Sequence, residues 1–177
     1  EVFEAQVQVI LEERPRVLSL FYGHYPDVIR RARDAGITVI CQVGSVREAH
    51  KMWAEGADIV VAQGMEAGGH VRGTLGLLPF LSALRDQAGD RPVLAAGGIA
   101  SPGDLRAALQ AGADGVWVGT AFLTTPESLA HPIYKRRLIE AATDDTEYRT
   151  GYSYGWKYGT PHRVIPSRRR WNPLNLM

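Results

Sequence analysis

A histidine that follows two glycines is the side chain of this sequence best suited to proton transfer. His70 ends the segment QGMEAGGH at residues 63–70, where Gly68 and Gly69 let the loop bend over a ligand. The pKa of an unperturbed histidine, about 6.5, suits proton exchange near neutral pH. We therefore expect His70 to act as a catalytic base, although a lone loop histidine is more often structural. Glu66 could orient His70 or cap the next helix, but the interpretation we favour is a surface carboxylate.

Two further glycine-containing segments could bind a phosphate group. Gly97 and Gly98 end one apolar run, and Gly119 with Thr120 ends the next. Such glycines let a backbone approach a ligand closely and present N–H groups to an anion. A helix that begins near Ser101 would add the positive end of its dipole. Either segment alone could be a tight turn, but the two together, on neighbouring strands, favour a phosphate site.

The apolar runs that precede these segments predict the strands that position them. Each run is short and ends in glycine or another small residue, which is typical of parallel strands buried on both faces. Five strands are expected, starting at Val17, Ile37, Asp58, Pro92 and Gly115. In a parallel α/β architecture the functional groups lie in the loops at the carboxyl ends of the strands. We therefore expect the three chemical segments to share one rim.

Segments with helical spacing of apolar residues alternate with the strands. Their expected inner positions are Phe3, Val7, Ile10 and Leu11; Val28, Ile29 and Ala32; Val46, Ala49 and Trp53; Leu77, Leu81 and Leu84; Leu105, Ala108 and Leu109; and Leu129, Ile133, Leu138 and Ala141. Ser101 should cap one helix, with Pro102 at its first position. Gly36, Gly56 and Gly112 each follow a helix and precede a strand, where a left-handed glycine commonly ends a helix. The repeated exits indicate a repeated βα unit.

Five parallel strands are too few to close a barrel, which needs eight strands and about 250 residues. We therefore predict an α/β fold, a parallel (β/α)₈ TIM barrel of which residues 1–142 hold the last five βα units, earlier units being absent. Residues 143–177 are expected to form a C-terminal extension packed on the barrel, since residues 151–159 are glycine and aromatic without a helical or strand period. The rival fold is an open doubly wound sheet that is complete as it stands.

The charge of the chain argues against two classes of partner. Lys and Arg number 20 and Asp and Glu 19, a formal net charge of +1. This balance gives no long-range attraction to nucleic acid or to a membrane surface. The basic cluster at residues 168–170 is interpreted as a solvated tail. No stretch approaches the roughly 18 apolar residues of a membrane span.

A single cysteine and scattered histidines limit the other chemistries. Cys41 lies within an apolar run, which indicates a buried, inert thiol and suits a reducing compartment, so we expect a cytoplasmic protein. Neither cysteine nor histidine pairs occur at metal-ligand spacing, so no metal site is expected. The histidines without such spacing are His24, His50, His131 and His162.

Three of the segments above resemble the signature segments of the nitronate monooxygenase (2-nitropropane dioxygenase) family. They are EAGGH at residues 66–70, AAGGI at residues 95–99 and GTAFL at residues 119–123. The likeness runs from about Val17 to Leu138, with a weaker echo at residues 146–165. The resemblance implies an FMN-dependent TIM-barrel oxidoreductase that uses O₂ to convert nitroalkanes or alkyl nitronates to a carbonyl compound and nitrite.

The family likeness also implies roles for individual residues. His70 would take a proton from the carbon next to the nitro group or stabilise the nitronate anion. The residues implied to bind FMN are Gln42, Ala67, Gly69, Ala96, Gly97, Gly98, Gly119 and Thr120. Gln42 stands where relatives often carry lysine, so its amide could hydrogen-bond the flavin without supplying a positive charge.

Three alternatives remain open at this point. A flavin-type enoyl-acyl-carrier-protein reductase would share the His70 segment but use a nicotinamide donor. A barrel that binds phosphate without flavin, or an inactive truncated scaffold, would also fit the sequence. The resemblance implies small-molecule partners alone, the substrate and O₂, and leaves a homo-oligomer open.

Overall fold

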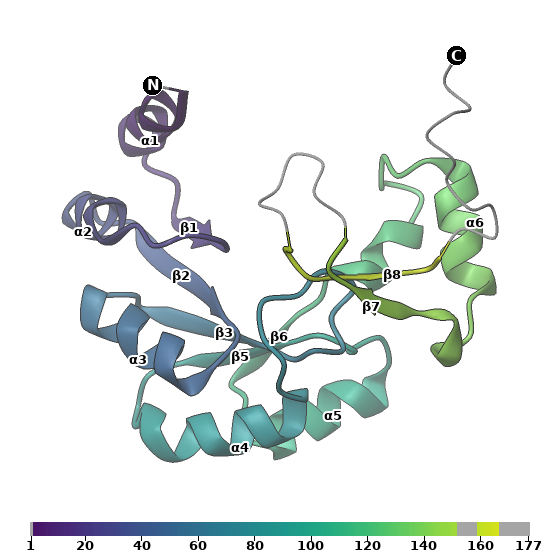
Figure 1. Ribbon diagram of the computed structural model, residues 1–177. Helices are drawn as coiled ribbons and strands as arrows, with labels where there is room; N and C mark the ends of the chain where they lie inside the picture. Colours follow the sequence, from purple (N-terminus) through teal and green to yellow (C-terminus); the bar gives the residue numbers. More distant parts are fainter. Residues whose placement is uncertain (1, 152–158, 167–177) are drawn as a thin grey trace. The chain divides into compact units, whose positions relative to one another are not determined.

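The structure is a computed structural model of the 177-residue chain, and it describes residues 2–151 and 159–166. The chain forms two compact units, drawn in Figure 1. Unit 1 comprises residues 1–67 and 71–118, and unit 2 comprises residues 68–70 and 119–177. The basic cluster at residues 168–170 and most of the glycine-aromatic segment lie outside the described residues.

Unit 1 is built on a five-stranded parallel sheet. Its strands are β1 (Val17–Leu20), β2 (Thr38–Val43), β3 (Ile59–Gln63), β5 (Val93–Ala96) and β6 (Gly115–Trp117). They lie in the sheet in the same order as in the chain, β1-β2-β3-β5-β6, and every neighbouring pair is parallel. A doubly wound sheet reverses its strand order at a switch point. The unbroken order therefore excludes that rival and confirms the prediction of consecutive βα units of a barrel.

Helices cover one side of this sheet, as Figure 1 shows. They are α1 (Val2–Glu13), α2 (Pro26–Asp34), α3 (Val46–Glu55), α4 (Leu77–Ala88) and α5 (Pro102–Gln110). The main core forms where their apolar stripes meet the sheet, and Ile29, Val39, Val60 and Phe80 are fully buried in it. The stripes predicted on α2 and α4 are confirmed as buried, as are Ala49 and Trp53 on α3.

The apolar stripe predicted on α5 is only partly correct. Ala108 is buried, but Leu105 and Leu109 are 37% and 44% exposed. The helix packs on β6, which is an edge strand of the sheet, so it has a neighbour on one side only. On α1, likewise, Val7 is buried whereas Phe3 is exposed.

The three predicted helix exits are built alike. Gly36, Gly56 and Gly112 have φ angles of 78°, 102° and 96°, the left-handed region that favours glycine. Gly56 and Gly112 are each followed by Ala-Asp, and each of these aspartates accepts a hydrogen bond from the backbone of a neighbouring strand. Asp58 accepts a hydrogen bond from the backbone of Val39 at 2.8 Å, and Asp114 accepts one from Val93 at 2.8 Å. Each aspartate thus joins the start of its strand to the neighbouring strand.

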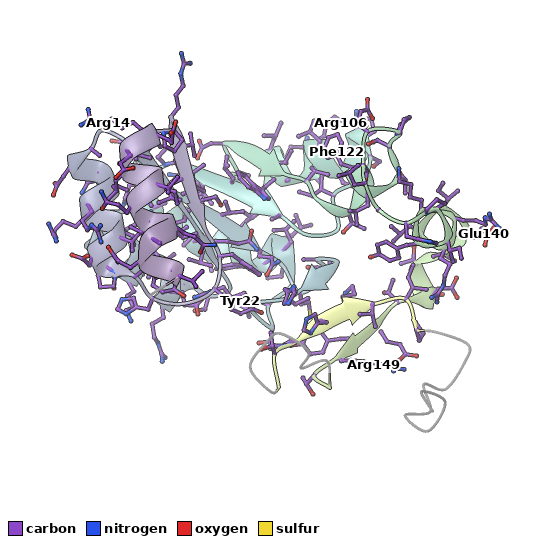
Figure 2. The ribbon with its side chains drawn as sticks, turned by 90° about the horizontal axis from the view of Figure 1, so that it is seen from above. Arg14, Tyr22, Arg106, Phe122, Glu140 and Arg149 are labelled. Atoms are coloured by element: carbon purple, nitrogen blue, oxygen red, sulfur yellow. The ribbon has the colours of Figure 1, made fainter. Side chains whose placement is uncertain are left out.

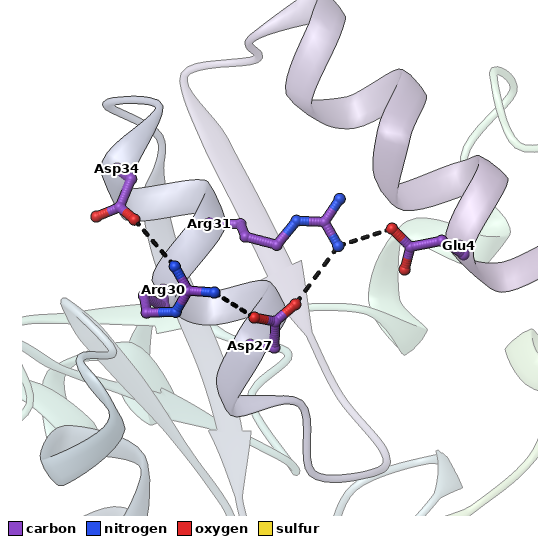
Figure 3. Close-up of polar contacts among 5 residues, drawn as sticks. All are labelled: Glu4, Asp27, Arg30, Arg31 and Asp34. Carbon is purple, nitrogen blue, oxygen red and sulfur yellow. Dashed lines mark hydrogen bonds and ion pairs between the residues drawn. The ribbon is translucent and has the colours of Figure 1, made fainter.

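Ion pairs connect α1 to α2 (Figure 3). Arg31 Nη1 lies 2.7 Å from a carboxylate oxygen of Glu4 and 3.5 Å from one of Asp27. Arg30 pairs with Asp27 and with Asp34 along the exposed face of α2. The hydrogen bond from Arg30 is the largest of the effects that lower the pKa of Asp27. Exposed pairs of this kind contribute little to stability, so their main effect is to orient the first helix.

Unit 2 contains a three-stranded antiparallel sheet in the order β4-β8-β7. Its elements are β4 (Gly69–His70), η1 (Thr120–Thr124), α6 (Pro132–Glu140), η2 (Thr143–Asp145), β7 (Glu147–Arg149) and β8 (His162–Val164). Figure 2 labels Phe122 on η1, Glu140 on α6 and Arg149 on β7. This sheet was not predicted from the sequence, because its strands are only two or three residues long.

The inner positions predicted around α6 are wrong for two residues. Leu129 is 102% exposed and precedes the helix, and Ile133 is 60% exposed. No residue of α6 is buried, because within unit 2 the helix packs mainly on the short η1. Leu138 and Ala141 instead line a cavity. The domain boundary expected between residues 142 and 143 stays a prediction.

None of the described helices is both long and apolar enough to cross a membrane. Within the same residues, no group of three or more His, Cys, Asp or Glu side chains could hold a metal ion.

Candidate active site

The inner face of the unit 1 sheet carries two glutamines near the carboxyl ends of its strands. Side chains alternate between the faces of a strand, and Ile40, Val61 and Ala96 form a small cluster on the face opposite the main core. Gln42 lies two residues after Ile40 on β2, and Gln63 lies two residues after Val61 on β3, so both glutamines are on this face. Gln42 and Ala96, both expected to bind the cofactor, therefore share one face.

The glycine pair after β5 packs against the loop that follows β3. A Cβ on Gly97 would lie 3.0 Å from both the Ala67 nitrogen and the Gly64 carbonyl oxygen, and its φ is 104°. Gly98 has a φ of 69°, and its Cβ would lie 3.1 Å from Glu66. The structure thus brings Ala67, Gly97 and Gly98 together. These close contacts within unit 1 are enough to require glycine at position 97, which agrees with the interpretation of this segment as a tight turn.

Glu66 is exposed, as expected of a surface carboxylate, and it also caps the next helix, the alternative that we did not favour. Both carboxylate oxygens lie 3.1 Å from the backbone nitrogen of Leu77, the first residue of α4. The N-cap position of α4 is Gly76, which has no side chain to accept a hydrogen bond. Glu66 supplies the missing acceptor from the preceding loop, which fixes the loop that leads to His70.

The backbone just after His70 is held by an arginine that sequence reasoning did not single out. Arg72 has a side chain only 12% exposed, and its Nε lies 2.9 Å from Oε2 of Glu48. Its Nη1 donates to the carbonyl of Phe21, directly after β1. Its backbone N–H donates to the buried Gln63 side chain at 2.7 Å. One residue therefore ties the residue after β1, the first turn of α3 and the last residue of β3 to the segment that follows His70.

Neighbouring contacts hold the same segment. The Tyr22 hydroxyl, on the residue labelled in Figure 2, donates to the carbonyl of Val71 at 3.1 Å. The Arg72 guanidinium lies 5.5 Å from the centre of the Tyr22 ring. A Cβ on Gly73 would collide with the carbonyl of Gly44, so the two backbones touch. In the sequence, the available signal was an arginine two residues after the candidate base and followed by glycine.

In unit 2, His70 lies against a second histidine. β4 and β8 place His162 directly opposite His70, and their ring centres are 4.1 Å apart. Burial and then the neighbouring His162 lower the pKa of His70 below its ordinary value. This favours the neutral imidazole that a base needs. Spacing could not have identified His162, because strand pairing between distant segments creates the contact.

A cavity of about 510 Å³ lies within unit 2. Its lining consists of Gly68, Gly69, Gly119, Thr120, Leu123, Tyr134, Leu138, Ala141, Ala142, Thr143, Thr146, Arg163, Val164 and Ile165. Three residues expected to bind the cofactor are thus brought together: Gly69, Gly119 and Thr120. Arg163 is a charged side chain of this lining, and its Nη1 donates to the Thr146 hydroxyl at 3.2 Å.

The cavity fits a phosphate-bearing ligand with an apolar portion. No neighbouring atom of the described residues lies within 4 Å of the position that a Cβ would take on Gly69 or Gly119, which leaves room for a ligand beside both backbones. The Thr120 hydroxyl and the Arg163 guanidinium provide donors, and the volume is in the range of about 300–1,000 Å³ found for ligand sites. Gln42, Ala67, Ala96, Gly97 and Gly98 belong to unit 1, and the structure does not join the two sets into one site.

Comparison with known proteins finds one family model and several relatives that match this chain. A family model described as nitronate monooxygenase matches residues 1–168. The nitronate monooxygenase of Pseudomonas aeruginosa is 42% identical over 169 residues, which cover 89% of this chain and 47% of that protein. The chain therefore spans about half the length of the curated relatives it matches.

Two solved structures share the fold. A nitroalkane oxidase from Streptomyces ansochromogenes has a TM-score of 0.83 and 37% identity, covering 94% of this chain and 49% of that one. FabK from Thermotoga maritima has a TM-score of 0.83 and 35% identity, covering 92% of this chain and 50% of that one.

Proposed function

Because the chain belongs to the nitronate monooxygenase family, we propose that the intact protein is an FMN-dependent nitronate monooxygenase. Its substrates are small alkyl nitronates or nitroalkanes together with O₂, and its products are a carbonyl compound and nitrite. The reaction needs neither nucleic acid nor a membrane, and we propose a cytoplasmic location. The family match, which includes every segment of the candidate site, is the observation that carries the proposal.

His70 is the proposed catalytic base. The hydrogen on the carbon next to a nitro group is acidic, because the electron pair left behind spreads onto the nitro oxygens. His70 accepts this proton, and the C–H electrons become those of the nitronate. The lowered pKa of His70 supports this role, since it keeps the imidazole neutral at the pH where a base must accept protons.

Bound FMN would supply the electron acceptor for the oxidation. The backbone N–H groups near Gly119 and Thr120, with the Thr120 hydroxyl, are suited to hold its phosphate. The remaining residues proposed to hold it are Gln42, Ala67, Gly69, Ala96, Gly97 and Gly98. Gln42 would contribute hydrogen bonds without charge. Arg163 lines the same cavity as Gly119 and Thr120 and would add a positive charge there.

The absorption spectrum of the purified intact protein tests this proposal. We expect a flavin spectrum that bleaches when a nitroalkane is added without oxygen, and nitrite formation once air is admitted. A matched assay with NADH and an enoyl thioester tests the reductase alternative. A colourless protein would reject the flavin assignment. Bleaching by NADH but not by nitroalkane or nitronate would favour the reductase instead.

A further inference from the structure

The side chain that contacts the proposed base is itself firmly held. His162 is only 8% exposed and lies in the middle strand of the unit 2 sheet, between β4 and β7. It is opposite His70 on one side and opposite Arg149 on the other. Because directly opposed side chains in an antiparallel pair share a face, the two imidazole rings meet. Their planes are inclined by 54° at a centre-to-centre distance of 4.1 Å.

A hydrogen bond fixes how the His162 ring is oriented. Its Nδ1 lies 2.8 Å from the carbonyl oxygen of Thr160. A carbonyl can only accept a hydrogen bond, so Nδ1 carries a hydrogen and donates it. The ring cannot rotate away from His70 without losing this bond. The ring of His162 therefore keeps one orientation against the imidazole of His70.

The side chains that flank the pair on β7 and β8 have polar partners of their own. Two imidazolium ions at this distance would repel each other, so His162 disfavours the protonated form of His70. Arg163 follows His162 on β8 and donates to Thr146. Arg149, opposite His162 on β7, pairs with Glu147 on its own strand.

We propose that His162 is a positioning residue for His70: its imidazole packs against the base and keeps that base in the neutral, proton-accepting form. The proposal rests on the base role of His70 given above. In the step it assists, the substrate C–H bond breaks, its electron pair remains in the nitronate, and the proton moves to a His70 nitrogen. His162 exchanges no atom with the substrate.

The test uses two variants of the intact protein that are neutral at every pH, His162→Phe and His162→Gln. The first keeps an aromatic ring against His70, and the second keeps a group able to donate to Thr160. His50→Gln is the matched control, because His50 is exposed in unit 1, where it contacts Gln87. Three quantities are followed against pH: kcat/KM for a nitroalkane, kcat/KM for its pre-formed nitronate, and the NMR titration of the labelled His70 ring.

Removing the second imidazole should make His70 easier to protonate. As the pH falls through the pKa of His70, the neutral base is lost and kcat/KM for the nitroalkane falls. A raised pKa of His70 therefore moves this fall, the acid limb of the pH profile, to higher pH. We expect both His162 variants to shift the nitroalkane limb and the His70 NMR midpoint upward by about half a unit or more. The nitronate profile, which needs no proton abstraction, should keep its acid limb, and the control should match the unmodified protein.

The outcomes separate this inference from the proposed function. An unchanged His70 NMR midpoint in both folded variants would overturn the role of His162, whatever the enzyme does. If the unmodified protein oxidises neither nitroalkane nor nitronate, the proposed function fails. The NMR titration still decides whether His162 controls the protonation of His70. If one variant does not fold, the other carries the test.

Discussion

Arg72 Nε lies 2.9 Å from Oε2 of Glu48, and this ion pair joins the first turn of α3 to the second residue after His70. The same carboxylate oxygen accepts the backbone N–H of Gly44 at 2.8 Å. The loop after β2 and the segment after the proposed base are therefore fixed by one carboxylate. Arg72 thus donates hydrogen bonds from both its side chain, to Glu48, and its backbone N–H, to Gln63.

Truncation of that arginine should affect both stability and catalysis. We expect Arg72→Ala to reduce the free energy of unfolding by about 1–3 kcal/mol, because the Glu48 carboxylate and the Phe21 carbonyl lose their donor. The kcat/KM for nitroalkane should fall as well, since the segment beside His70 loses its anchor. Urea unfolding and steady-state kinetics measure the two effects. Arg33→Ala is the control, because Arg33 is 51% exposed and lies 3.6 Å from Asp58; equal effects of the two changes would contradict the anchoring role.

The single cysteine should be inert in the folded protein. Burial is the main cause that raises the pKa of Cys41 to about 11. At pH 8 the thiol therefore remains protonated, and it is also closed off within the core. A disulfide reagent such as DTNB should label Cys41 only after denaturation. Rapid labelling of the native protein would show that the thiol is accessible and that the core assignment of β2 is wrong.

The capping box at the start of α5 should contribute measurably to stability. Ser101 accepts a hydrogen bond from the backbone of Asp104, whose carboxylate bonds back to Ser101 and has its pKa lowered mainly by that side chain. Loss of such a cap costs about 1 kcal/mol. Ser101→Ala should lower the unfolding free energy by that amount in chemical denaturation. The control, Ser82→Ala on the exposed side of α4, should be neutral or slightly stabilising; equal results would argue against the cap.

Gly119 should be needed for the cofactor and not for the fold. Its φ is −117°, and within the described part of the chain no neighbouring atom lies within 4 Å of the position of a Cβ. Gly119→Glu should therefore fold in the intact protein but lose FMN, because a carboxylate would repel the phosphate. The flavin-to-protein ratio measures this effect. Gly151→Glu is the control, since a Cβ at Gly151 is equally unobstructed and the residue does not line the cavity; full flavin in the Gly119 variant would reject the phosphate assignment.

Sequence reasoning succeeded where one local pattern sufficed to define an element. The five parallel strands are continuous apolar runs, and the Ser101 cap and the Gly56 exit each depend on a few adjacent residues. Burial on α5 was misjudged because a helical stripe does not reveal that β6 is an edge strand. His162 was missed for a related reason: no local pattern indicates that β8 will pair with β4.

The central claim, that His70 is a base, is tested most directly by His70→Asn in the intact protein with two substrates. Proton transfer by a positioned side chain typically contributes about 10²–10⁴-fold to the rate. We expect kcat/KM for a neutral nitroalkane to fall by roughly that factor while FMN is retained. With the pre-formed nitronate the loss should be far smaller, because the proton has already been removed. Equal losses on both substrates, or no loss on either, would contradict the assignment of His70 as the base.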